Sequence, residues 1–172
     1  SPVTFGGLIG SRPLFGHANG DISSIDGSIT SITGESIEGV LTDNQENLIV
    51  VAEHSVQSFN NNQSLLWVMK NLQTSGHAIG FEINNIQTFW CAQPDGLNGT
   101  LKVISCDSGQ QITAMSCSKI SNIVASGNRV VVGNEAGEVL VWDADMLNRR
   151  LEGDIDPAQD DRKRAMRDRL KA

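Results

Sequence analysis

The residues with catalytic chemistry are few and scattered along this 172-residue chain. The three histidines, His17, His54 and His77, lie far apart, and only His54 has an acidic neighbour, Glu53. A general base needs a partner within hydrogen-bond reach, and spacing places no second group beside any of them. The chain also lacks a Gly-x-Ser-x-Gly elbow, a Walker loop, a His-Glu-x-x-His pair and an EF-hand ligand string. The sequence therefore predicts a protein without catalytic residues, metal or other cofactor.

The cysteines indicate that the protein resides in a reducing compartment. Cys91, Cys106 and Cys117 show no C-x-x-C spacing, and their odd number argues against a disulfide framework. We therefore expect a cytoplasmic protein. The alternative is a secreted one, in which the two glycosylation sequons at 62–64 and 98–100 would matter.

The charge is divided unevenly along the chain. The net charge is −7, and six of the 13 Lys and Arg residues lie between positions 162 and 171, so the preceding body is strongly acidic. An acidic body repels nucleic-acid phosphate and anionic membrane surfaces. No stretch approaches the roughly 18 apolar residues of a membrane span. The expected partners are other proteins, with no nucleic acid, membrane or small-molecule substrate.

One strand pattern recurs four times, at residues 20–26, 54–60, 99–105 and 137–143. In an alignment of the four seven-residue copies, the residue in the third column is aliphatic, the residue in the sixth column is large and apolar, and the residue in the seventh column is small and polar. Counted at the seventh column (26, 60, 105 and 143), the copies are 34, 45 and 38 residues apart. These offsets scatter about the ~40–45 residues of one propeller blade. The sixth column is expected to be buried between sheets as the blade core: Ile25, Phe59, Ile104 and Trp142.

The intervals between the copies contain the other strands of such blades. A Gly127-Asn128 turn separates apolar runs at 120–125 and 129–133, which is a hairpin signal. Similar pairs of runs precede the second and third copies, and a further strand is expected after each copy, at 28–33, 64–69, 111–116 and 146–151. The sequence thus predicts an all-β fold of four-stranded antiparallel propeller blades. A sandwich or barrel is the alternative.

About three and three-quarter blades are expected. Residues 3–10 fit the second strand of the first blade, which would then lack its innermost strand. Closed propellers need at least ~4 blades. We therefore expect a segment of a longer polypeptide, or a chain that is completed by a partner docking blade to blade.

The fourth copy resembles a repeat of a known family. Residues 137–143 resemble the closing strand of a WD40 repeat, with Trp142-Asp143 as the signature dipeptide, and Gly76-His77 resembles the family's Gly-His pair. The repeats are degenerate, since the other copies carry Ile-Asp, Phe-Asn and Ile-Ser instead. The resemblance implies a non-catalytic protein–protein interaction scaffold within a larger multiprotein assembly.

Two other propeller classes remain as alternatives. Residues 56–59 followed by 64–67 are similar to the strand–turn–Trp pattern of quinoprotein-like propellers, which would imply an enzyme or an envelope assembly factor. That class would need a cluster of charged residues facing the cofactor. A glycan-binding propeller would need exposed aromatic residues on several equivalent loops.

The composition changes after residue 153, so the propeller segment is assigned to 1–153 and a charged C-terminal helix or linker to 154–172. Asp156 fits an N-cap and Pro157 the first helical position, which predicts a helix over 157–171. This helix is either solvated or a partner-docking segment. Docking would use two apolar and three basic residues: Met166, Leu170, Arg162, Lys163 and Arg164.

Overall fold

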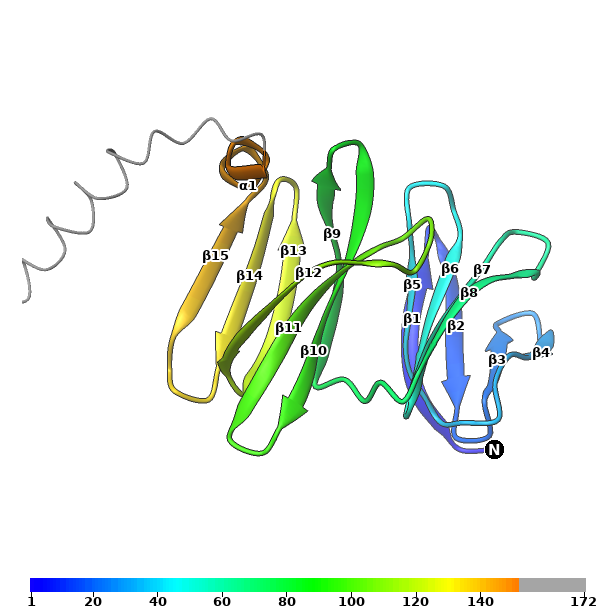
Figure 1. Cartoon of the computed structure of the whole chain (residues 1–172). Coiled ribbons are helices and arrows are strands. Elements are labelled where there is room, and N and C mark those ends of the chain that lie inside the picture. Colours follow the sequence, from blue (N-terminus) through cyan, green and yellow to red (C-terminus); the bar gives the residue numbers. More distant parts are fainter. Residues whose placement is uncertain (152–172) are drawn as a thin grey trace, which may run out of the picture.

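The computed structural model describes residues 1–151, which form fifteen strands and one short helix (Figure 1). The strands of the first two sheets are β1 (Val3–Ile9), β2 (Arg12–His17), β3 (Asp21–Ser24), β4 (Ile29–Ser31), β5 (Ile37–Thr42), β6 (Leu48–Ala52), β7 (Ser55–Phe59) and β8 (Leu65–Lys70). The remaining elements are β9 (Gly76–Ile83), β10 (Ile86–Asp95), β11 (Asn98–Ser105), β12 (Gln111–Ser118), β13 (Ile120–Ser126), β14 (Arg129–Asn134), β15 (Val139–Asp143) and α1 (Ala144–Leu151).

The strands form four antiparallel meanders, which are the blades of a propeller. The first blade is β1–β4, the second β5–β8, the third β9–β12 and the fourth β13–β15. Figure 1 shows the four sheets one after another, with the first and fourth blades at opposite ends. The innermost strands β1, β5, β9 and β13 share one hollow of about 520 Å³. The predicted fold class is confirmed.

Each blade packs face to face on the next through its own apolar cluster. Ile22, Val40, Val50 and Phe59 belong to the cluster between the first two blades. The second and third blades share a cluster that contains Ile49, Val51, Val56, Trp67, Leu72, Phe89, Cys91, Ile104 and Cys106. The third and fourth share Phe81, Ile83, Trp90, Ala92, Leu101, Val103, Ile120, Ile123, Val130, Val132 and Ala144.

Strand β10 shows why the sequence forms this arrangement. Phe89 and Cys91 face the second blade, whereas Trp90 and Ala92 face the fourth. Successive side chains of a strand point to opposite faces, so a strand that is covered on both faces must be apolar at consecutive positions. All four side chains are accordingly buried.

The predicted number of blades is correct, but the incomplete blade was assigned to the wrong end. The first blade has four strands, and the fourth has three within residues 1–151. Residues 3–9 form the innermost strand β1, and β2 was missed because Pro13 and Gly16 obscure its strand pattern. Pro13 is tolerated because it lies beyond the ladder with β3, which ends at the Leu14–Ser24 pair.

The strand expected at 146–151 is also wrong, because this segment belongs to helix α1. The Asp143 carboxylate accepts a hydrogen bond from the Asp145 backbone N–H at 3.1 Å, as an N-cap does. Leu147 packs against the cluster between the third and fourth blades, which anchors the helix. The helix expected over 157–171, the boundary at residue 153 and the five candidate docking residues lie outside the described residues.

The sixth column is buried as expected in two copies, half-buried in a third and exposed in the first. Ile104 is fully enclosed, Phe59 is 8% exposed and Trp142 is half-buried, but Ile25 is 77% exposed. This column faces the preceding blade, and no blade precedes the first one within residues 1–151. In addition, β3 ends at Ser24, so Ile25 lies in the turn that follows. The prediction was therefore wrong for Ile25.

Candidate interaction surface

The turns at the upper end of the blades in Figure 1 form a polar surface, which we call the upper rim: the β5–β6, β9–β10 and β13–β14 turns and α1. Side chains fix these turns. The Asp43 carboxylate accepts hydrogen bonds from the backbone N–H groups of Gln45 at 2.9 Å and Asn47 at 2.8 Å. Asn84 and Asn85 adopt positive φ angles of 51° and 63°, which asparagine tolerates better than most residues.

Hydrogen bonds between blades make the upper rim continuous. The Asn44 amide donates to the Glu82 carboxylate at 2.8 Å, and the Asn44 backbone N–H donates to the side-chain oxygen of Gln87. The Gln45 amide donates to the Asp107 carboxylate at 3.2 Å. These bonds join a turn of the second blade to the third, so the polar groups are held on a preorganised surface.

A cleft of about 700 Å³, the rim cleft, opens between the β9–β10 turn, the β13–β14 turn and α1. Phe81 and Ala144 are its buried apolar residues. The polar residues that line it are mostly amides and carboxylates: Glu82, Asn84, Asn85, Gln87, Asn128, Asp145 and Asn148. The lining contains no lysine or arginine among the described residues. Such a cleft favours donor groups and positive charge.

Asn148 lines the rim cleft and contains a buried acceptor. Its Oδ1 atom is buried and has no hydrogen-bond partner within the described chain. Leaving a buried acceptor unpaired costs about 1–3 kcal/mol. An incoming N–H group that reaches this oxygen would recover part of that cost.

The Gly76-His77 pair has a packing role. His77 is half-buried and stacks on Phe89 with ring centroids 6.5 Å apart. A Cβ at Gly39 would lie 2.2 Å from His77 Nε2, so the ring fills the space that this glycine leaves between β5 and β9. Desolvation lowers the pKa of His77. Gly76 lies beside Ile123 of the fourth blade.

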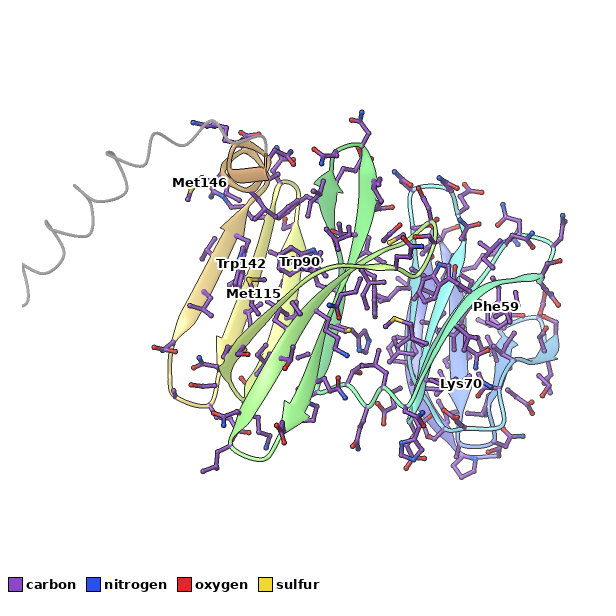
Figure 2. The ribbon with its side chains drawn as sticks, in the orientation of Figure 1. Phe59, Lys70, Trp90, Met115, Trp142 and Met146 are labelled. Carbon is purple, nitrogen blue, oxygen red and sulfur yellow. The ribbon has the colours of Figure 1, made fainter. Side chains whose placement is uncertain are left out.

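Trp142 and Asp143 act in a different blade from Gly76 and His77, so the four signature residues do not form one network. Trp142 packs against Trp90 with ring centroids 5.6 Å apart, and Figure 2 shows the two indoles side by side. Asp143 pairs with Arg129 on the neighbouring strand at 3.2 Å, and this hydrogen bond lowers the pKa of its carboxyl group.

The third blade contains a hydrogen-bond chain that was not predicted. The Trp90 indole N–H donates to the Thr88 hydroxyl at 2.8 Å, and this hydroxyl donates to the Phe81 carbonyl at 2.6 Å. The only signal in the sequence was a threonine at the start of an apolar run. The chain links β9 and β10 inside the core.

The groups with catalytic chemistry are either buried or form isolated pairs at the surface, and the contact of His17 with Ser23 was not expected from spacing. Cys91 and Cys106 are buried, and desolvation raises the pKa of each thiol to about 12. His17 contacts the Ser23 hydroxyl at 2.7 Å, and His54 lies 3.7 Å from Glu53 at the surface. Within residues 1–151 no three His, Cys, Asp or Glu residues gather as metal ligands. No helix in this part of the chain is long and apolar enough to cross a membrane.

Sequence reasoning missed the rim cleft. The Gly127-Asn128 pair was used only as a turn signal, and the Asn84-Asn85 pair lies in another turn of the same kind. They come together because the third and fourth blades are adjacent, which no local pattern shows.

No family model and no curated protein matches this chain. Solved structures do resemble it. The Neurospora crassa Pan2 WD40 domain superposes with a TM-score of 0.64 and 13% identity, over 83% of this chain and 47% of that one. The computationally designed Ika4 protein gives a TM-score of 0.63 and 18% identity, over 83% of this chain and 91% of the design.

A third similar structure is BBS1N in complex with ARL6DN, with a TM-score of 0.63 and 10% identity, over 83% of this chain and 47% of the matched one. The chain thus spans about half the length of the natural propellers in these two comparisons. At these identities the likeness shows the fold alone, which is a β-propeller.

Proposed function

We propose that this chain is a non-catalytic scaffold of a multiprotein assembly and that it binds a segment of a partner protein in the rim cleft. The observation that carries the proposal is the cleft itself, in which carboxylates and amides surround a small apolar floor. Rigid scaffolds commonly present binding residues on loops of this kind. The similar structures include the Pan2 WD40 domain and BBS1N in complex with ARL6DN, and these support the same class of function.

The chemistry of the cleft indicates the kind of segment that would bind. Glu82 and Asp145 would attract a lysine or arginine, and the Asn148 oxygen would accept a backbone or side-chain N–H. An extended peptide with a basic side chain satisfies both. Acidic or phosphorylated segments would be repelled.

The absence of catalysis is part of the proposal. It is supported by the thiols of Cys91 and Cys106, which are buried and held protonated by their raised pKa values. The quinoprotein-like alternative needs charged groups facing a cofactor. The hollow between the inner strands is instead lined by Leu8, Val40, Ile79, Ile123 and other mostly apolar residues, with His77 and without a carboxylate, lysine or arginine among them. The residues that line the hollow supply no such charged cluster.

The intracellular location expected from the cysteines is also part of the proposal. The free thiols of Cys91, Cys106 and Cys117 are compatible with a reducing compartment.

Capture of partners by the tagged full chain, followed by cross-linking mass spectrometry, would test the proposed function. We expect cross-links from the upper rim, and at least a tenfold loss of affinity for the captured partner in Glu82→Lys and Asp145→Lys. Asp95→Lys is the matched control, because Asp95 is an exposed carboxylate at the C-terminal end of β10, at the opposite end of the blade. Equal binding by all three variants would contradict the proposal.

A further inference from the structure

The two terminal blades each leave one apolar sheet face uncovered within the described chain. On the fourth blade, Val124, Val131 and Val141 lie directly opposite one another across three strands. Val141 is 58% exposed and the adjacent Val139 is 68% exposed. An exposed apolar patch of this kind marks an interaction site or an aggregation liability.

The register of the strands identifies what this face is built to contact. The Val131–Val141 pair corresponds to the Trp90–Val103 pair of the third blade, because each joins the second strand to the third at the same step of the repeat. Trp90 and Val103 are fully buried, since the fourth blade covers them. The valine face is therefore the surface that accepts a following blade.

The first blade presents the complementary face. Phe15 of β2 corresponds to Val50 of β6, which is buried against the preceding blade. Phe15 has no such cover within residues 1–151 and is only half-buried. Leu8 of β1 and Ile29 of β4 lie on the same face and are 70% and 68% exposed.

We propose that these two faces bind each other between two copies of the chain, so that the fourth blade of each copy packs on the first blade of the other. One chain carries both faces of an ordinary blade-to-blade interface. The fourth blade has the face that accepts a following blade and the first blade has the face that accepts a preceding blade, as head-to-tail packing requires. Four blades per copy produce a ring of eight, which lies within the ~4–8 blades of known propellers. Two copies close this ring about a two-fold axis and leave no face uncovered.

Two of the similar structures, the Pan2 and BBS1N chains, are consistent with a ring built from two copies. The chain matches about half of the Pan2 and BBS1N chains, so a second copy has the extent needed to complete a ring of similar size. The inference deepens the proposed function by naming the partner of the blade faces. It leaves the rim cleft free, because the cleft lies between the third and fourth blades.

The mass of the purified full chain in solution tests the pairing. We expect light scattering after size exclusion to give twice the monomer mass of 18.5 kDa at micromolar concentration. Val141→Glu and Leu8→Glu should each give monomers, because every interface then carries one charged face. Leu97→Glu is the control, since Leu97 is 87% exposed in the β10–β11 turn, away from both faces. Val139→Lys replaces Val141→Glu if circular dichroism shows that the latter is unfolded.

Mixing the two monomeric variants distinguishes head-to-tail packing from other dimers. Val141→Glu retains an intact first blade and Leu8→Glu an intact fourth blade, so the mixture should recover dimers joined by one interface. A symmetric dimer of like faces would not recover in this way. A monomeric wild type, a larger oligomer, a dimeric Val141→Glu or a failure of the mixture to pair would overturn the inference. The rim variant Glu82→Lys should remain dimeric. The oligomeric state therefore does not depend on partner binding in the rim cleft, and either proposal can be refuted without the other.

Discussion

The third and first blades carry the same repeat but differ in how much of it is buried. In the third blade, β10 and β11 are ten and eight residues long, and both faces of the sheet are covered. In the first blade, the corresponding strands β2 and β3 have six and four residues, and one face is open within residues 1–151. Ile104 and Ile25 occupy the same column, yet one is enclosed and the other exposed. A side chain's contribution to the fold therefore depends on whether a neighbouring blade covers it.

This difference predicts a gradient of stability along the chain. In repeat architectures, the stability of a unit depends on its interfaces with its neighbours. The third blade has two such interfaces and the first has one within residues 1–151. In the monomer, local unfolding should therefore begin in a terminal blade such as the first, and not in the third.

The largest expected effect is a contrast within the sixth column. Phe59→Ala should lower the free energy of unfolding by about 3–5 kcal/mol, because it removes a buried aromatic ring from the interface of the first two blades. Ile25→Ala should change it by less than about 0.5 kcal/mol in the monomer. Denaturant titration of the two variants, each in the Val141→Glu background, measures the difference. Equal losses would refute the burial argument.

Two glycines with positive φ provide the next contrast. Gly109 has φ 70°, and a Cβ there would meet the Trp67 ring at 2.8 Å, whereas Gly27 has φ 85° and open space around it. Alanine at either site costs about 1–2 kcal/mol of backbone strain. Gly109→Ala should cost about 1–3 kcal/mol more, because Trp67 must shift. If thermal or chemical unfolding shows equal losses, the contact with Trp67 is not tight.

Thr88→Val tests the hydrogen-bond chain of the third blade. The substitution preserves shape but leaves the Trp90 indole N–H and the Phe81 carbonyl without their partner. The expected loss is about 1–3 kcal/mol in the free energy of unfolding. Ser24→Ala removes a hydroxyl that contacts Asp26 in an exposed turn of the first blade and should cost less than about 0.5 kcal/mol. A reversed order would show that the buried chain adds nothing.

The smallest effect concerns pH. Desolvation lowers the pKa of folded His77 below its ordinary value of 6.5, so below this pH the unfolded chain binds more protons than the folded one. The contribution of neutral His77 is present above pH 6.5 and is lost as the pH falls through the folded pKa. His77→Gln should therefore flatten the fall in unfolding free energy between about pH 6.5 and 5. The wild type over the same pH range is the reference, and an unchanged slope in His77→Gln would contradict the prediction.

The sequence revealed the parts of the fold that depend on local pattern. The four strand copies and the Gly127-Asn128 turn predicted the blades because alternation and turn chemistry act over a few residues. Strand β2 was missed because Pro13 and Gly16 are tolerated there for reasons of register. Residues 146–151 were assigned to a strand because a short apolar segment does not distinguish a strand from a helix.

The candidate site could not be predicted in the same way. The rim cleft joins turns about 40 residues apart, at Asn84 and Asn128, and it exists only because the third and fourth blades are adjacent. The exposure of Ile25 likewise depends on the absence of a preceding blade among the described residues. Both features follow from how the blades are ordered around the propeller.

Amide hydrogen exchange on the full chain, in the monomeric Val141→Glu variant, tests most directly whether coverage by neighbouring blades sets stability. We expect the slowest exchange in β10 and β11, whose faces are covered on both sides, and exchange at least tenfold faster in β2 and β3. Equal protection of the first and third blades, or slower exchange in the first, would contradict the claim.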